Sequence, residues 1–138
     1  MKTINTKFSN SKKQGDWGLG RAIAYFTLTE HTVSLPLTES QDYDLLVDDG
    51  NSIKRVQVRT SSRVSPIGKP LVGLRVMGGN QSYNTVKKFD NSKVELIFVT
   101  TVNFGDYVIP TNVFDAKSEL TIDKRFDKYK VELNGSVG

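Results

Sequence analysis

Asp44, Gln57 and Arg59 are spaced so that they could act together on a phosphate group. Asp44 begins an apolar run, and Gln57 and Arg59 alternate with valines in a second run that follows a turn. A carboxylate, an amide oxygen and a guanidinium group that converge can hold a divalent metal ion against a phosphate. The pattern therefore indicates metal-dependent hydrolysis of a phosphodiester, with these three residues as the candidate catalytic groups.

The candidate metal ligands are all oxygen donors. They are the Asp44 carboxylate, the Gln57 amide oxygen and the backbone carbonyl of Val58. Magnesium prefers oxygen ligands and keeps several of its waters, so one or two protein carboxylates suffice, and Mg²⁺ is the expected cofactor. An ordinary ion pair between Asp44 and Arg59 on neighbouring strands would give the same residue pattern, so a purely structural role stays open at this point.

Two strands joined by a turn would position these groups. Residues 43–47 and 53–60 are rich in apolar and β-branched residues, and residues 48–51 between them read Asp-Asp-Gly-Asn, a composition typical of turns. Side chains alternate along a strand, so we expect Gln57 and Arg59 on one face and the neighbouring valines on the other, in the core.

The rest of the chain predicts an α+β domain with a central mixed β-sheet and flanking helices. Apolar residues recur at helical spacing over 18–30, and Asp16 is the candidate N-cap of that helix. We expect residues 1–14 to form a flexible basic arm and residues 15–138 to form a single domain. Further extended runs are predicted at 33–35, 71–77, 94–102 and 107–109, and a short helix at 111–116.

Composition narrows the classes of protein. The chain has 138 residues, of which 37% are hydrophobic and 25% charged, as expected for one globular domain. It has no cysteine and a single histidine, which excludes a disulfide framework, a thiolate metal site and a polyhistidine zinc site. No apolar run approaches the roughly 20 residues of a membrane span, and the polar N-terminus lacks a secretory signal, so we expect a cytoplasmic protein without a membrane partner. The net charge of +4 is compatible with a polyanionic partner.

Cations and amides on the later strands and loops are the candidate contacts to double-stranded DNA. Lysine and arginine would bind phosphates and set the salt dependence, whereas arginine, glutamine and asparagine could read base edges. Each of these residues could equally be a solvated surface residue. The candidates are Arg63, Lys69, Arg75, Gln81 and Asn84.

The stretch from Gly15 to Thr60, together with YNTVKKFDNSKVELIFVTT and GDYVIPT further on, resembles the PD-(D/E)XK nuclease superfamily. The similarity is to its small branch of bacterial, often cyanobacterial, group I intron homing endonucleases. In that pattern an acidic residue opens one strand, and the next strand carries an acidic or amide residue, then any residue, then a lysine. Asp44 corresponds to the first element and Gln57-Val58-Arg59 to the second. The resemblance implies an α-β-β-β-α-β core, to which residues 84–89 would add the second helix. It also implies cleavage of double-stranded DNA at a specific long site by a homo-oligomer, a dimer or a tetramer.

Two departures from the family pattern leave a second interpretation open. Arg59 replaces the lysine, and arginine stays charged and cannot act as a base. Many members also carry a glutamate early in the first helix, whereas residues 18–21 here contain no carboxylate; Asp16 is the candidate substitute. The alternative is therefore a catalytically weak or inactive nuclease-fold protein that binds DNA or a partner protein. A structural subunit with an unrelated role is the third hypothesis.

Overall fold

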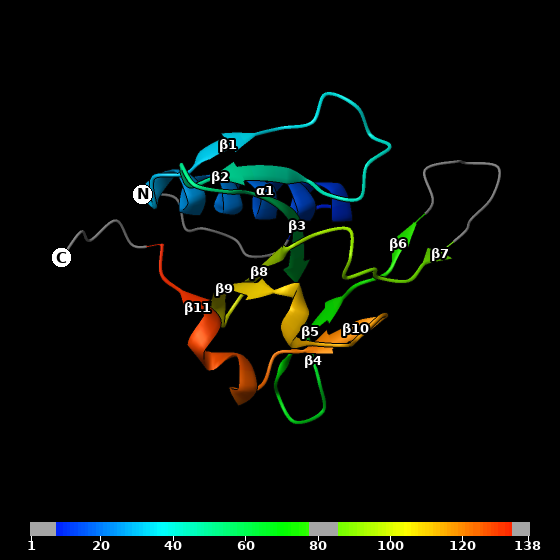
Figure 1. Cartoon of the computed structure of the whole chain (residues 1–138). Helices are drawn as coiled ribbons and strands as arrows, with labels where there is room; N and C mark the ends of the chain where they lie inside the picture. Colours follow the sequence, from blue (N-terminus) through cyan, green and yellow to red (C-terminus); the bar gives the residue numbers. More distant parts are fainter. Residues whose placement is uncertain (1–7, 78–85, 134–138) are drawn as a thin grey trace.

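A six-stranded sheet forms the middle layer of the protein, described here from a computed structural model over residues 8–77 and 86–133 (Figure 1). All neighbouring strands in it are antiparallel except β3 and β8, which are parallel. A parallel pair needs a crossover connection, and here that connection contributes two of the three strands of a second, smaller sheet. In spatial order the strands are β1 (Thr32–Ser34), β2 (Leu45–Asp48), β3 (Ile53–Ser61), β8 (Leu96–Thr101), β9 (Gly105–Pro110) and β11 (Lys130–Val131).

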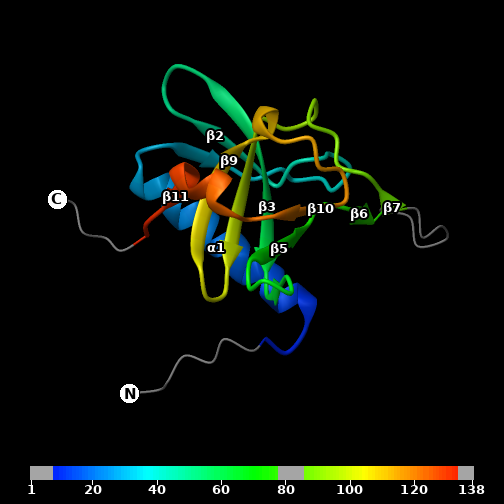
Figure 2. The same cartoon turned by 90° about the horizontal axis from the view of Figure 1, so that it is seen from below.

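Helix α1 (Ser11–Leu28) covers one face of this sheet, and Figure 2 shows it running across the strands. Its N-cap is Asn10, whose side-chain oxygen accepts a hydrogen bond from the Lys13 amide at 2.9 Å. The buried residues between helix and sheet form one apolar cluster: Ala22, Phe26, Leu45, Val47, Val56 and Phe98. No helix in the described part of the chain is long and apolar enough to cross a membrane.

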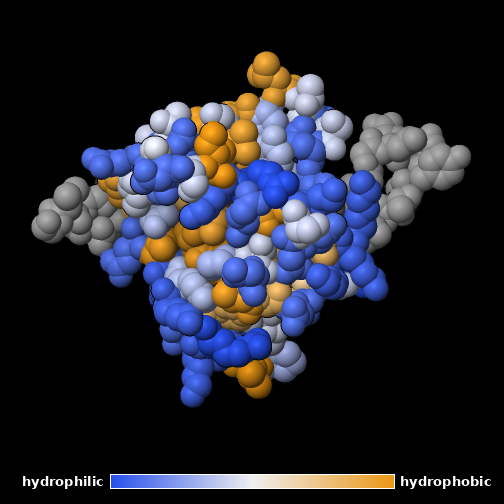
Figure 3. All heavy atoms as spheres, viewed as in Figure 1, coloured by the Kyte–Doolittle hydropathy of each residue, from blue (hydrophilic) through white to orange (hydrophobic). Residues whose placement is uncertain are grey.

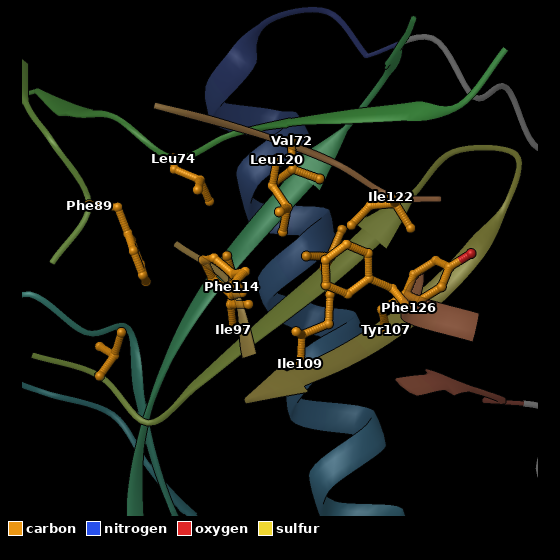
Figure 4. Close-up of a cluster of buried hydrophobic side chains, with 12 residues drawn as sticks. Val72, Leu74, Phe89, Ile97, Tyr107, Ile109, Phe114, Leu120, Ile122 and Phe126 are labelled. Atoms are coloured by element: carbon orange, nitrogen blue, oxygen red, sulfur yellow. The ribbon is translucent and has the colours of Figure 1, made fainter. Parts of the chain in front are cut away.

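The opposite face is covered by a three-stranded sheet and by two 3-10 helices. The sheet has the order β10 (Glu119–Thr121), β5 (Pro70–Gly73), β4 (Arg63–Val64), and the 3-10 helices are η1 (Thr111–Val113) and η2 (Lys124–Tyr129). A small pair, β6 (Val76–Met77) and β7 (Val86–Lys87), projects from the body. Figure 4 shows ten of the buried side chains that join these elements to the main sheet: Val72, Leu74, Phe89, Ile97, Tyr107, Ile109, Phe114, Leu120, Ile122 and Phe126.

Helix α1 approaches the sheet closely at Gly18. A Cβ atom on Gly18 would lie 2.0 Å from the Thr60 hydroxyl oxygen and 3.3 Å from the Thr100 methyl group. One turn further, the Arg21 guanidinium donates to the carboxylate of the buried Asp106, with Nη2 to Oδ2 at 2.6 Å, and the Thr100 hydroxyl donates to the same carboxylate. A buried carboxylate needs such partners, so this ion pair fixes the helix on β8 and β9.

The structure confirms the α+β class and most of the predicted strands, and it corrects several boundaries. The helix begins at Ser11 rather than after an Asp16 cap, so residues 11–14 are helical and do not belong to the predicted arm. The run 71–77 is divided into β5 and β6, which belong to different sheets. The second core helix predicted at 84–89 is wrong for the part of that segment that is described, because Val86–Lys87 is a strand.

We expect Gly18→Ala to lower the free energy of unfolding by about 1–3 kcal/mol, because the new methyl group meets the Thr60 side chain in a packed contact. The matched control is Gly20→Ala in the same helix, where a Cβ would meet no heavy atom within 4 Å. That change should stabilise the protein by up to about 1 kcal/mol through helix propensity. Urea unfolding measures both, and equal stabilisation by the two substitutions would show that the close contact at Gly18 is not required.

Candidate active site

The candidate site lies along the edge of β3 where β2 stops running beside it. The last register pair between the two strands is Leu45 with Val56, whereas β3 continues to Ser61 alongside β8. Backbone groups of β3 beyond that point lose the partners that β2 supplies, and buried backbone groups must find others. Three side chains from different segments provide them, and these side chains line the site.

Asp44 is the first of these side chains. Its amide donates to the Val56 carbonyl at 2.8 Å, although the register partner of Val56 is Leu45. Asp44 and Leu45 therefore both lie opposite Val56, as the two residues of a β-bulge do. The bulge turns the Asp44 side chain along β3, where Oδ2 accepts a hydrogen bond from the Val58 amide at 2.7 Å. The carboxylate is therefore held in place by backbone, with Oδ1 accepting no hydrogen bond from the residues that the structure describes.

Arg59 and Gln14 bind two backbone carbonyls further along the same edge. Arg59 Nη1 donates to the Val58 carbonyl at 2.9 Å. Gln14 Nε2, from the first turn of α1, donates to the Thr60 carbonyl at 3.4 Å, while the Thr60 hydroxyl donates to the Gln14 carbonyl at 3.3 Å. The hydrogen bonds of Gln14 thus hold the start of α1 against the end of β3.

These groups surround a hollow of about 370 Å³ between α1 and the sheet edge. Burial lowers the pKa of Arg59 below its ordinary value, and the charge of Asp44 partly offsets that shift. The guanidinium remains charged at physiological pH even so, and it is poorly hydrated, which favours a bound anion over water. The hollow is lined by Ser11, Gln14, Gly15, Leu19, Asp44, Val58, Arg59 and Thr60.

Gln57 does not line this hollow. Its side chain is buried on the other side of β3, where Nε2 donates to the Asp42 carbonyl at 3.4 Å and where it lines a second hollow. Its amide oxygen Oε1 is buried and has no hydrogen-bond partner among the residues that the structure describes. Asp44 and Arg59 thus line the same hollow, as the sequence predicts. Gln57 lies two residues before Arg59 on β3, but its side chain lines a different hollow.

The other predicted site residues lie further away or outside the described segments. Arg63 pairs with Glu119 at 3.2 Å on the exposed surface of the small sheet, and Lys69 and Arg75 are exposed. Asp16 is exposed on α1 and does not line the hollow. Gln81 and Asn84 fall outside the described residues, and the DNA-contact roles of all five candidates stay predictions.

Gln14 is the site residue that the sequence did not indicate. It lies four residues before Gly18, on the helix face that approaches β3, but the polar run 11–14 has no apolar period to suggest a helix. The combination of a cap residue at Asn10 with a close-contact glycine one turn beyond Gln14 is the signal that could have placed it.

A family model described as PD-(D/E)XK endonuclease matches residues 9–134. The chain belongs to the PD-(D/E)XK endonuclease family. Its fold is that of the bacterial homing endonuclease I-Ssp6803I: the TM-score is 0.70 and the identity 23%, over 90% of this chain and 84% of that chain. The structure of MepB is less similar, with a TM-score of 0.41 and 9% identity over 75% of this chain and 79% of that one, and such a score does not establish a shared fold. No curated protein sequence matches the chain.

PD-(D/E)XK endonucleases generally use divalent metal ions, and the oxygen donors of this site suit such an ion. Within residues 8–77 and 86–133, no three or more Asp, Glu, His or Cys side chains lie close enough together to hold a metal ion among them. A hard cation that keeps most of its waters needs fewer carboxylates. Asp44 offers a carboxylate oxygen to this hollow, and Val58 offers a carbonyl that accepts one hydrogen bond from Arg59. The Gln57 amide oxygen, which is buried and accepts no hydrogen bond from the described residues, belongs to the second hollow. These donors fit a divalent cation with oxygen ligands.

We expect Gln14→Glu to create a second carboxylate in the hollow and to make a divalent cation stabilise the protein. Without metal the substitution should destabilise, because the carboxylate replaces the amide that donates to the Thr60 carbonyl. Saturating magnesium or manganese should then raise the melting temperature more than in the wild type, since a ligand that binds only the folded state stabilises it.

Thermal unfolding with and without each ion measures this effect. Gln41→Glu is the matched control, because it makes the same chemical change in a loop away from the hollow. An identical metal-induced shift in the two variants would mean that Gln14 does not face a cation site.

Proposed function

We propose that this chain is a magnesium-dependent endonuclease of the intron-homing type, which hydrolyses phosphodiester bonds in double-stranded DNA at a specific long site. The observation that carries the proposal is the Asp44 carboxylate, anchored on the Val58 amide and placed beside Arg59 in one hollow. Family membership supports the chemistry, and the homing-endonuclease fold supports the type of substrate. A long site that is cut on both strands calls for more than one active site, so we propose that the chain acts as a homo-oligomer, a dimer or a tetramer.

The chain's own groups have separate roles in this proposal. Asp44 and the Val58 carbonyl would hold Mg²⁺, which when bound supplies an activated water and neutralises negative charge on the phosphate. Gln57, the third ligand that the sequence predicts, lines the other hollow and would have to turn its side chain to reach this ion. The backbone hydrogen bond from Val58 keeps the Asp44 carboxylate oriented. Arg59 uses one of its five N–H donors on the Val58 carbonyl, and the remaining donors can bind a non-bridging oxygen of the scissile phosphate.

A second candidate function rests on Arg59 itself. Because arginine cannot give up its proton near neutral pH, it cannot activate a water as a lysine could. The lining of the hollow adds no carboxylate from α1, since Gln14 and Ser11 lie where the helix faces it. A nuclease-fold protein that binds DNA or a partner protein and cleaves slowly, or not at all, would have these features.

We expect Asp44→Asn to lower the cleavage rate roughly 100-fold, because the substitution removes the metal-binding charge. The asparagine carbonyl can still accept the Val58 amide, so the fold should be kept, which thermal unfolding checks. The substrate is a library of long duplex DNA fragments, incubated with magnesium, and sequencing counts the new ends that cleavage produces.

Asp16→Asn is the control for this experiment, because Asp16 is exposed outside the hollow. It should cleave like the wild type. Cleavage by Asp44→Asn at the wild-type rate would remove Asp44 from the mechanism.

If the arginine limits the chemistry, Arg59→Lys should raise the cleavage rate about tenfold or more, because general acid–base catalysis contributes factors of that size and above. The gain should increase with pH from about pH 7 to 10 as the lysine loses its proton, because the ordinary pKa of lysine is about 10.4 and burial at this position lowers the pKa of a cation. Single-turnover cleavage across that range measures it, with the exposed Arg63→Lys as the control. A wild type and an Arg59→Lys variant that both bind DNA without cleaving it would instead support the binding protein.

A further inference from the structure

The second hollow, next to Gln57, carries a group of lysines that no predicted role accounts for. It has a volume of about 360 Å³ and lies between the segment before β2 and the segment between β7 and β8. Its charged lining residues are Asp42, Lys87, Lys88, Asp90 and Lys93, all of them exposed, and its floor includes Gln57, Phe89 and Val94, which are buried.

The three lysines have no ion-pair partner among the residues that the structure describes. The nearby Asp90 carboxylate is already bound, since Oδ1 accepts the Ser92 amide at 2.9 Å and the Ser92 hydroxyl at 2.6 Å. These bonds lower the pKa of Asp90, with smaller contributions from nearby lysine charges. The lining therefore has three lysines against two carboxylates, Asp42 and Asp90, and none of the three lysines is held in an ion pair with a described residue.

The backbone that carries Lys88 and Lys93 is held in place by packing and by hydrogen bonds. Phe89 is buried, its ring lies 5.7 Å from that of Phe114, and its amide donates to the Lys117 carbonyl at 2.8 Å. On the other side, the Lys93 amide donates to the Asp90 carbonyl at 3.1 Å and closes a turn. Lys88 and Lys93 thus extend from anchored backbone, which lowers the entropy lost when they bind.

The lysine hollow adjoins the candidate active site. Asp42 lines the former and Asp44 the latter, and two residues of chain span at most about 7 Å. Likewise, adjacent residues of β3 wall the two cavities, Gln57 the lysine hollow and Val58 the other. Hydrophilic side chains also gather on the surface next to β7 (Figure 3).

We infer that the lysine hollow binds the sugar–phosphate backbone of the DNA beside the phosphate held at Asp44, with Lys87, Lys88 and Lys93 as its phosphate contacts. This inference rests on the proposed nuclease function and names the path of the substrate. Duplex DNA carries one charge per roughly 1.7 Å, so a phosphate beside Asp44 brings others to the adjoining surface. The predicted contact Arg63 is in a weaker position, because its guanidinium already pairs with Glu119.

The test compares two triple variants with equal charge loss. One is Lys87→Ala with Lys88→Ala and Lys93→Ala; the other replaces three exposed lysines at η2 and β11, on the opposite side of the molecule in Figures 1 and 2: Lys124, Lys128 and Lys130. Binding to a random-sequence duplex, with chelator present to prevent cleavage, is measured from about 50 to 200 mM salt. The first triple should make the slope of log K against log salt shallower by about 2.7, and the control triple should leave it unchanged.

Single substitutions keep the inference testable if the first triple does not fold. Each of the three single Lys→Ala variants should change the slope by about 0.9. Equal effects of the two triples would overturn the inference, because net charge rather than this hollow would govern binding. If neither triple alters the binding of duplex DNA, the inference is overturned but the nuclease proposal is left intact. If the wild type neither binds nor cleaves duplex DNA, both are overturned.

Discussion

The unpaired edge of β3 is the constraint from which the candidate site follows. β2 ends its pairing at Val56, but β3 must continue to Ser61 to complete its parallel ladder with β8. The Val58 amide, the Val58 carbonyl and the Thr60 carbonyl are then bound by the side chains of Asp44, Arg59 and Gln14, in that order. The backbone's need for partners thus gathers a carboxylate, a guanidinium and an amide in one hollow.

The position of α1 depends on a second set of contacts, one turn further along the helix. Gln14 can reach the Thr60 carbonyl only because Gly18 lets the helix lie close to β3. The Arg21–Asp106 pair then fixes the helix over β8 and β9, and the Arg21 guanidinium also lies over the Trp17 ring at 5.3 Å. Since breaking one member of a buried ion pair leaves an uncompensated charge, these residues influence the site without lining it.

Local sequence patterns predicted the β2–β3 hairpin and the position of Asp44 before it, but they could not predict the conformations of the long side chains. Alternation along β3 fixes the direction in which each Cβ leaves the strand, so it placed Gln57 and Arg59 on one face. The Arg59 side chain is long enough to turn back to the Val58 carbonyl, and its tip enters the hollow on the side of α1. Periodicity also missed the first turn of α1, because its polar residues make contacts through Gln14 rather than through an apolar stripe.

The charge of Arg59 close to Asp44 limits the negative charge that the site can offer a metal ion. Their opposite charges partly compensate each other, and the other oxygen donor of this hollow, the Val58 carbonyl, is neutral. A cation entering the site must therefore compete with a guanidinium that cannot lose its charge by deprotonation. That competition eases when a phosphate arrives, because the substrate adds negative charge that both Arg59 and the cation can share. Metal and DNA should consequently bind this site cooperatively, each raising the affinity of the other by the same factor.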